Sequence, residues 1–254
     1  MPAFIALVSL TGILMAGCSH DPSDTLTAPA EGTCRVLAIA DLSARTNNSS
    51  AVDCSQPHTA QTIKVATFPT TVGSDYHADP VGAFAYQTCT EAFAASLGAA
   101  DSVAPRAQLS WAWFGPTDDA WRRGARWFRC DAVGAPPDQS SMADIPADLT
   151  NLLAGFPPDH WLTCATGSAF TSRVNVACDQ PHTWRAVTAV KLGQPKDPYP
   201  GDHISAVRAH NYCSDAVGAY LNYANTYEFG YTTFHRAEWK AGNRRAVCWA
   251  KTTK

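Results

Sequence analysis

The feature that most constrains this chain is an internal repeat that contains cysteines. The segment Cys54-Ser55-Gln56-Pro57-His58-Thr59 recurs as Cys178-Asp179-Gln180-Pro181-His182-Thr183, with five identities in six positions. The offset is 124 residues, and at the same offset Cys89 corresponds to Cys213. Self-similarity over such a span predicts two successive units of one fold.

A second shared motif closes each copy. Trp121 to Cys130 and Trp239 to Cys248 both follow the pattern Trp-x-x-Gly-x-Arg-x-x-x-Cys, now at an offset of 118 residues. The first copy therefore carries about six extra residues between its third cysteine and its tryptophan. We place them in Gly98 to Arg106, which has a loop-like composition, because loops tolerate insertions at low cost.

These motifs divide the chain into five parts. We expect a signal peptide with a lipobox at 1–18, a flexible tether at 19–32, repeat 1 at 33–133, a linker at 134–159 and repeat 2 at 160–254. The tether is rich in small polar residues and proline, and the linker contains two Pro-Pro pairs. Within the linker, Ile145 to Leu153 has the composition of a helical turn or two.

Each copy is predicted to be α+β, a small antiparallel sheet with one helix. Stretches of small and apolar residues without proline predict helices at Ala83 to Leu97 and Ile204 to Tyr223. Alternating β-formers predict strands after each Pro-His turn and before and after each Trp-x-x-Gly segment, which we expect to be a hairpin loop. The expected strands are Ile63 to Phe68, Ala186 to Leu192, Leu109 to Phe114, Ala125 to Val133, Tyr227 to Phe234 and Arg244 to Lys251.

Each copy contains four cysteines, which permit three pairings. Pairing within a copy is favoured because each unit must be self-sufficient, and we prefer first with second and third with fourth. The expected disulfides are Cys34–Cys54, Cys89–Cys130, Cys164–Cys178 and Cys213–Cys248. Closing loops of this size stabilises a small module by roughly 3 to 4 kcal/mol per bridge. The chain has no Cys-x-x-Cys pair, so we expect no metal site.

The N-terminus has the pattern of an exported protein. Its apolar stretch from Ala3 to Ala16 is too short to span a bilayer but suits a signal peptide. The residues Met15-Ala16-Gly17-Cys18 resemble the lipobox of bacterial lipoproteins, in which the cysteine thiol receives diacylglycerol. Lipidation of Cys18 leaves eight of the nine cysteines, an even number that can all pair. An ordinary secretory signal and a secreted protein are the alternative.

The lipobox, the Cys-x-x-Pro-His motifs and the Trp-x-x-Gly-x-Arg-x-x-x-Cys motifs together resemble the septum-formation family of actinobacterial envelope proteins. The resemblance covers nearly all of the mature chain as two copies. In that family an acidic or amide residue often follows the histidine by three positions, which Gln61 matches and Arg185 does not. The resemblance implies a role in or near cell division, and it implies no catalytic residues.

The repeated motif residues are expected to serve the fold. Pro57, His58, Pro181 and His182 recur without a recurring Ser, Asp or Glu beside them, so a hydrogen-bonding strut is favoured over a general base. Buried tryptophan with glycine at positive φ is the structural interpretation of the second motif, whose members are Trp121, Gly124, Arg126, Trp239, Gly242 and Arg244. The alternative is a tryptophan-lined ligand platform, which would have to be exposed.

The sequence thus favours an exported, lipid-anchored, non-catalytic binding or scaffold protein on the outer face of the cytoplasmic membrane, linked to septum formation. The expected partners are envelope or division proteins, with no cofactor. The formal charge of −3 offers no basic excess for nucleic acid. The alternative is a wall-modifying hydrolase in which His58 or His182 meets a carboxylate at the seam between the copies.

Overall fold

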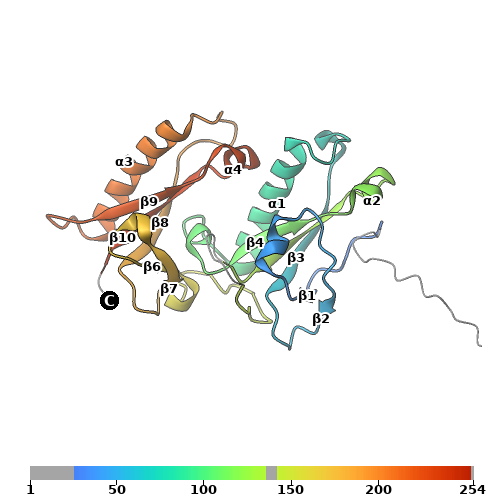
Figure 1. Cartoon of the computed structure of the whole chain (residues 1–254), viewed down its shortest axis with the longest axis horizontal. Helices are drawn as coiled ribbons and strands as arrows, with labels where there is room; N and C mark the ends of the chain where they lie inside the picture. Colours follow the sequence, from blue (N-terminus) through green and yellow to red (C-terminus); the bar gives the residue numbers. More distant parts are fainter. Residues whose placement is uncertain (1–25, 136–141, 253–254) are drawn as a thin grey trace, which may run out of the picture.

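A computed structural model describes residues 26–135 and 142–252. In these ranges the chain forms two halves that lie side by side, each with its own five-stranded antiparallel sheet (Figure 1). We call residues 33–133 the first half and residues 160–252 the second half. The α+β class predicted from the sequence is confirmed, and the arrangement is consistent with a repeat.

The elements follow the same order in the two halves. The first half contains β1 (Cys34–Arg35), β2 (Ala51–Val52), β3 (Ala60–Thr67), α1 (Asp79–Leu97), β4 (Ser110–Phe114), α2 (Asp118–Arg122) and β5 (Trp127–Val133). The second half contains β6 (Thr163–Thr166), β7 (Val174–Ala177), β8 (Trp184–Lys191), α3 (Asp202–Tyr220), β9 (Phe229–Thr233), α4 (Arg236–Ala241) and β10 (Arg245–Lys251).

The two sheets also share strand order and an irregularity. Their orders are β2-β1-β3-β5-β4 and β7-β6-β8-β10-β9, which correspond strand for strand. The pairing of β3 with β5 passes over Ile63, and the pairing of β8 with β10 passes over Val187, 124 residues later. A bulge of this kind bends the strand and increases its twist. The two halves therefore match in local distortions as well as in topology.

The long helix of each half covers one face of its sheet. In the first half, α1 begins with Pro80 in its first turn and ends at Gly98, whose φ of 66° supplies the left-handed cap. Along β5, alternate residues face the helix, and Phe128 and Cys130 pack with Cys89 of α1. The intervening residues face the opposite side of the sheet, which we call its outer face.

The prediction of one helix per half was incomplete, because each Trp-x-x-Gly segment contains a short helix instead of a plain hairpin loop. In α2 the hydroxyl of Thr117 accepts a hydrogen bond from the backbone N–H of Ala120, and two acidic residues occupy the first turn. The equivalent α4 begins after His235 and carries Glu238 in its first turn. The tryptophan of each motif is buried beneath its helix.

The linker between the halves is packed into a hydrophobic core. Ile145, Leu149 and Leu153 lie in one cluster with the end of α1 and with the Cys164–Cys178 disulfide of the second half. Their segment forms bends and turns rather than the helical turns considered from the sequence. This cluster joins core residues of both halves.

The extra residues of the first half also contribute to the junction. In the Gly98–Arg106 loop, Asp101 accepts a hydrogen bond of 2.7 Å from Arg245, and Arg106 donates to the carbonyl of Ala186 at 3.4 Å. Just beyond it, the Gln108 amide donates to three oxygen atoms of the second half, including the carbonyl of Val176 at 3.0 Å. The inserted loop therefore fastens one half to the other.

Candidate functional site

Four disulfides join the eight cysteines of the described ranges. The pairs are Cys34–Cys54, Cys89–Cys130, Cys164–Cys178 and Cys213–Cys248, the pairs preferred from the sequence. In each half one disulfide holds the first strand to the turn before the Pro-His motif, and the other holds the long helix to the sheet. No cluster of metal-ligating side chains occurs among the described residues.

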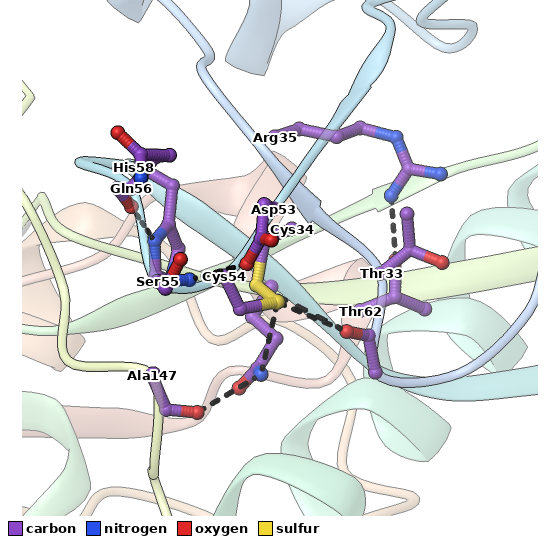
Figure 2. Close-up of a disulfide and its surroundings, with 12 residues drawn as sticks. Thr33, Cys34, Arg35, Asp53, Cys54, Ser55, Gln56, His58, Thr62 and Ala147 are labelled. Atoms are coloured by element: carbon purple, nitrogen blue, oxygen red, sulfur yellow. Dashed lines mark hydrogen bonds between the residues drawn. A yellow bond between two sulfur atoms is a disulfide. The ribbon is translucent and has the colours of Figure 1, made fainter.

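The repeated histidines lie on turns, and both are buried. The Nδ1 atom of His58 lies 2.8 Å from the carbonyl oxygen of Gln56, and that of His182 lies 2.8 Å from the carbonyl of Gln180. Because a carbonyl only accepts, Nδ1 carries the proton in both rings. Figure 2 shows the His58 ring beside Gln56, close to the Cys34–Cys54 disulfide. Each imidazole thus ties its own turn together.

The hydrolase alternative required one of these rings to meet a carboxylate at the seam. Within residues 26–135 and 142–252, neither ring makes a hydrogen bond or ion pair with Asp or Glu. The Nε2 atom of His58 is buried without a hydrogen-bond partner there, which leaves it no proton acceptor or donor to work with. No observation on the described residues favours catalysis by these histidines.

The tryptophans of the second motif are buried, with Trp121 at 4% exposure and Trp239 at 2%. Their indole N–H groups donate to the carbonyls of Ser74 at 2.7 Å and Asp197 at 2.9 Å. They are therefore unavailable as an exposed ligand platform. The glycines are in the left-handed region, with φ of 104° at Gly124 and 120° at Gly242.

The two motif arginines differ in their contacts. Arg126 stacks on Trp121 at 3.9 Å from the ring centre, and its Nη1 donates to the carbonyls of Trp121 and Ala125 at 2.7 and 2.8 Å. Arg244 lies 5.4 Å from the Trp239 ring centre, and its Nε is buried without a hydrogen-bond partner among the described residues. The same sequence position is thus satisfied in one half and unsatisfied in the other.

Arg244 lines a groove between the halves, which we call the seam groove. It has a volume of about 450 Å³ and lies between α1 of the first half and α4 with the adjoining strands of the second half. Figure 1 shows α4 beside α1. The residues used below that line it are Tyr86, Glu91, Lys191, Lys240, Arg244 and Arg245.

Tyr86 forms the floor where the halves meet. Its ring packs edge-on against Trp111 at 5.0 Å, and a Cβ atom built on Gly242 would lie 2.9 Å from its Cδ1. Burial raises the pKa of the Tyr86 phenol to about 12, so the hydroxyl stays protonated at neutral pH. The groove wall is therefore aromatic and neutral at this point, and its charges come from the surrounding side chains.

Comparison with protein-family models gives one match to this architecture. A family described as Septum formation matches residues 31–248, which is most of the chain. The chain belongs to the septum-formation family. The match is one span across both halves, so the interpretation of each half as a separate copy of the family domain stays a prediction. Searches of curated proteins and of solved structures found no match.

In this septum-formation protein the two motifs of each half lie at opposite ends of one strand pair, because Ala60 after the Pro-His turn pairs with Val133 while Thr67 pairs with Trp127 after the Trp-x-x-Gly segment. Cys18 and the rest of the expected signal peptide lie outside the described residues. None of the described helices has the length and apolar composition needed to cross a membrane. Of the residues singled out from the sequence, only Gly242 and Arg244 line the seam groove.

The sequence interpretation missed the other residues of the groove. Tyr86, Lys191 and Lys240 belong to no shared motif, and the way in which two repeats dock is not encoded in the repeat itself. One signal pointed toward the junction, namely the extra residues in Gly98 to Arg106, since an insertion in one copy often serves a contact that the other copy lacks. Asp101 of that loop forms ion pairs with Lys191 and Arg245, which line the groove.

Proposed function

We propose that this protein is an exported, lipid-anchored envelope protein that acts without catalysis, as a binding or scaffold module in septum formation. The family match supports the septal part of the proposal. The observation that carries the rest is the state of the cysteines, because all eight in the described ranges are paired within their own half.

Disulfides of this number are typical of an oxidising compartment. Cys89 and Cys130 are buried in a core cluster, so their sulfur atoms serve the fold and are not exposed for reaction. Cys18 then remains as the single cysteine outside the set, directly after the apolar N-terminal stretch. This arrangement supports acylation of Cys18 and an outward-facing folded part.

A non-catalytic role is supported by the use of the motif side chains. The two histidines bind turn carbonyls, the two tryptophans are buried, and Arg126 binds its own backbone. These contacts account for the motif residues as parts of the fold. The remaining surface offers a groove between the halves, which suits binding.

The test is the position of an export-competent fluorescent fusion in growing cells of the source bacterium. We expect enrichment at midcell for the native chain and loss of that enrichment in Cys18→Ala. A uniform peripheral signal for the native chain would contradict the septal role. Midcell enrichment that survives in Cys18→Ala would contradict the lipid anchor while leaving the septal role in place.

A further inference from the structure

We propose that the seam groove binds an oxyanion group, a carboxylate or a phosphate, through the Arg244 guanidinium. The proposal rests on the binding function proposed above and names the chemistry of its ligand. It starts from the charges around the groove, taken one by one.

Four cations line the groove, and three of them are already paired with side chains. Arg245 and Lys191 share Asp101, at 2.7 and 3.3 Å, and Lys240 binds Asp79 at 2.7 Å. The one carboxylate in the lining is Glu91, which accepts a hydrogen bond of 2.9 Å from Gln87. Arg244 is the remaining groove cation, and its Nε atom is buried with no hydrogen-bond partner among the described residues.

Arg244 is also held in place for binding. It lies beside the buried Trp239 ring at 5.4 Å, and its backbone carbonyl accepts a hydrogen bond of 2.7 Å from the N–H of Leu192. The Nε–H of Arg244 is buried without an acceptor, which is costly, and an oxyanion held by the part of the guanidinium that lines the groove would supply the missing counter-charge. The planar fork of arginine matches the two oxygens of a carboxylate or phosphate.

The first half supplies the internal comparison. Arg126 occupies the same motif position, but its Nη1 binds two carbonyls of its own chain. Gly124, the partner of Gly242, has open space where a side chain would project, whereas Gly242 abuts Tyr86 of the other half. Among the described residues, the second copy of the motif thus packs against the other half at Gly242 and lines the seam groove, whereas Gly124 of the first copy contacts nothing at the equivalent point.

The size of the groove limits the ligand. About 450 Å³ is in the range of small-molecule sites, so it fits a short segment or a small molecule better than a protein surface. The oxyanion can come from two sources, the carboxylate of a peptide or the phosphate of a polymer or metabolite. Separate probes for the two groups distinguish these sources.

The experiment follows the arginine Nε–Hε resonances by NMR in the full chain folded with its four disulfides. Inorganic phosphate and acetate are titrated separately at constant ionic strength, with chloride as the reference salt. We expect a saturable shift of the Arg244 resonance, and of the neighbouring Arg245 resonance, with one or both probes at millimolar concentration. A response to phosphate alone assigns a phosphate ligand, and a response to acetate alone assigns a carboxylate ligand.

Three variants complete the test. Arg126→Gln is the matched control and should leave the titration unchanged. Because Arg244→Gln removes the Arg244 resonance itself, this variant is followed through the Nε–Hε resonance of Arg245, which also lines the groove and whose saturable shift should be lost. Arg244→Lys keeps the charge but loses the fork, and should weaken binding about tenfold. The absence of a saturable shift in the native chain would overturn the proposal, as would an equal shift with chloride or an undiminished shift of the Arg245 resonance in Arg244→Gln. The localisation of the fusion is independent of these results, so the septal role is tested separately.

Discussion

The outer faces of the two sheets have the same backbone plan and opposite chemistry. In the first half this face buries Arg129 and Asp131, joined at 2.9 Å, and the hydroxyl of Thr62 donates to Asp131 at 2.7 Å. In the second half the corresponding face is an apolar cluster of Ala165, Trp184, Ala186, Val247 and Trp249. Position for position, Val247 replaces Arg129 and Trp249 replaces Asp131.

The charged face of the first half is covered by the long β1–β2 connection. Asn47 of that connection accepts a hydrogen bond of 2.9 Å from Arg129, and Arg35 donates to Thr62 at 2.8 Å. Burial lowers the pKa of Arg35, and the nearby Arg129 adds to the effect. The second half has a shorter connection, in which Phe170 packs on Trp184 and Trp249.

The comparison teaches that the helix side and the outer side of the sheet obey different constraints. The helix side repeats its disulfide, its bulge and its small residues in both halves. The outer side accepts either a hydrogen-bonded ion network or aromatic packing, provided that every buried polar group finds a partner. Mutations on the two sides should therefore behave differently.

The largest effect is expected from the helix-to-sheet disulfides, where the halves should respond alike. The two bridges span 41 and 35 residues, so removing either as a double Cys→Ala variant should cost about 4 kcal/mol in the free energy of unfolding. Urea unfolding of Cys89→Ala/Cys130→Ala and of Cys213→Ala/Cys248→Ala measures this. A loss of unfolding free energy in only one of the two double variants would contradict the claim that the helix sides of the two sheets are equivalent.

A smaller effect, present in the first half alone, is expected from the carboxylate of the outer face. Asp131→Ala leaves two buried guanidinium groups without their anion and should cost about 3 kcal/mol. The control is Asp119→Ala, an exposed carboxylate paired with Arg122 and Arg123, which should cost less than about 1 kcal/mol. Equal losses for the two variants in thermal unfolding would show that the network is not buried.

Substitutions at Gly124 and Gly242 separate two contributions to the free energy of unfolding, the strain of the turn and the contact between the halves. Both lie at positive φ, so alanine at either position is strained by about 1 kcal/mol or more. Gly242→Ala adds a Cβ that would lie 2.9 Å from Tyr86, whereas the space at Gly124 is open. We expect Gly242→Ala to cost about 1 kcal/mol more than Gly124→Ala in urea unfolding. Equal costs would indicate that the halves do not dock through Tyr86.

The smallest effect concerns one exposed His–Asp pair in each half, which joins the start of the long helix to the short helix. The histidine is at the long helix in the first half and at the short helix in the second. His77 binds Asp118 in the first half at 3.0 Å, and Asp202 binds His235 in the second at 2.9 Å. The hydrogen bond with Asp202 raises the pKa of His235, while Tyr199 and then His235 lower the pKa of Asp202.

The sign of the pH dependence follows from these two directions. The contribution of His235 is fully present below the ordinary histidine pKa and is lost as pH rises through the raised value. The contribution of Asp202 is present above the ordinary aspartate pKa and is lost as pH falls through the lowered value. NMR titration of His235 should show its pKa returning toward the ordinary value in Asp202→Asn. An unchanged titration would contradict the pair.

The sequence predicted the parts of the fold that recur. The equal spacing from Cys54 to Cys89 and from Cys178 to Cys213 identified the repeat, and the helix expected at Ala83 to Leu97 is found at Asp79–Leu97. The short helices α2 and α4 were not predicted, because a helix of one or two turns is too short to show a periodic pattern of apolar residues. Thr117 followed by two aspartates was the available sign, as an N-cap before an acidic first turn.

The docking of the halves and the outer-face network could not be predicted in the same way. Arg129 and Asp131 stand two residues apart in an apolar strand, which signals that they share a face, but Asn47 joins them from 82 residues away. Likewise, Arg126 and Arg244 are identical in the motif, and only packing against α1 gives Arg244 its groove. Long-range contacts of single residues leave no repeated pattern in the sequence.

The central claim is that the folded part is oxidised within each half and held at the membrane through Cys18. Peptide mapping by mass spectrometry, without reductant, on protein isolated from the source cells tests it directly. The account predicts four linked peptide pairs that match Cys34–Cys54, Cys89–Cys130, Cys164–Cys178 and Cys213–Cys248, and an N-terminal peptide with diacylglycerol on Cys18. Free thiols at the eight positions, bridges between halves, or an unmodified Cys18 would contradict it.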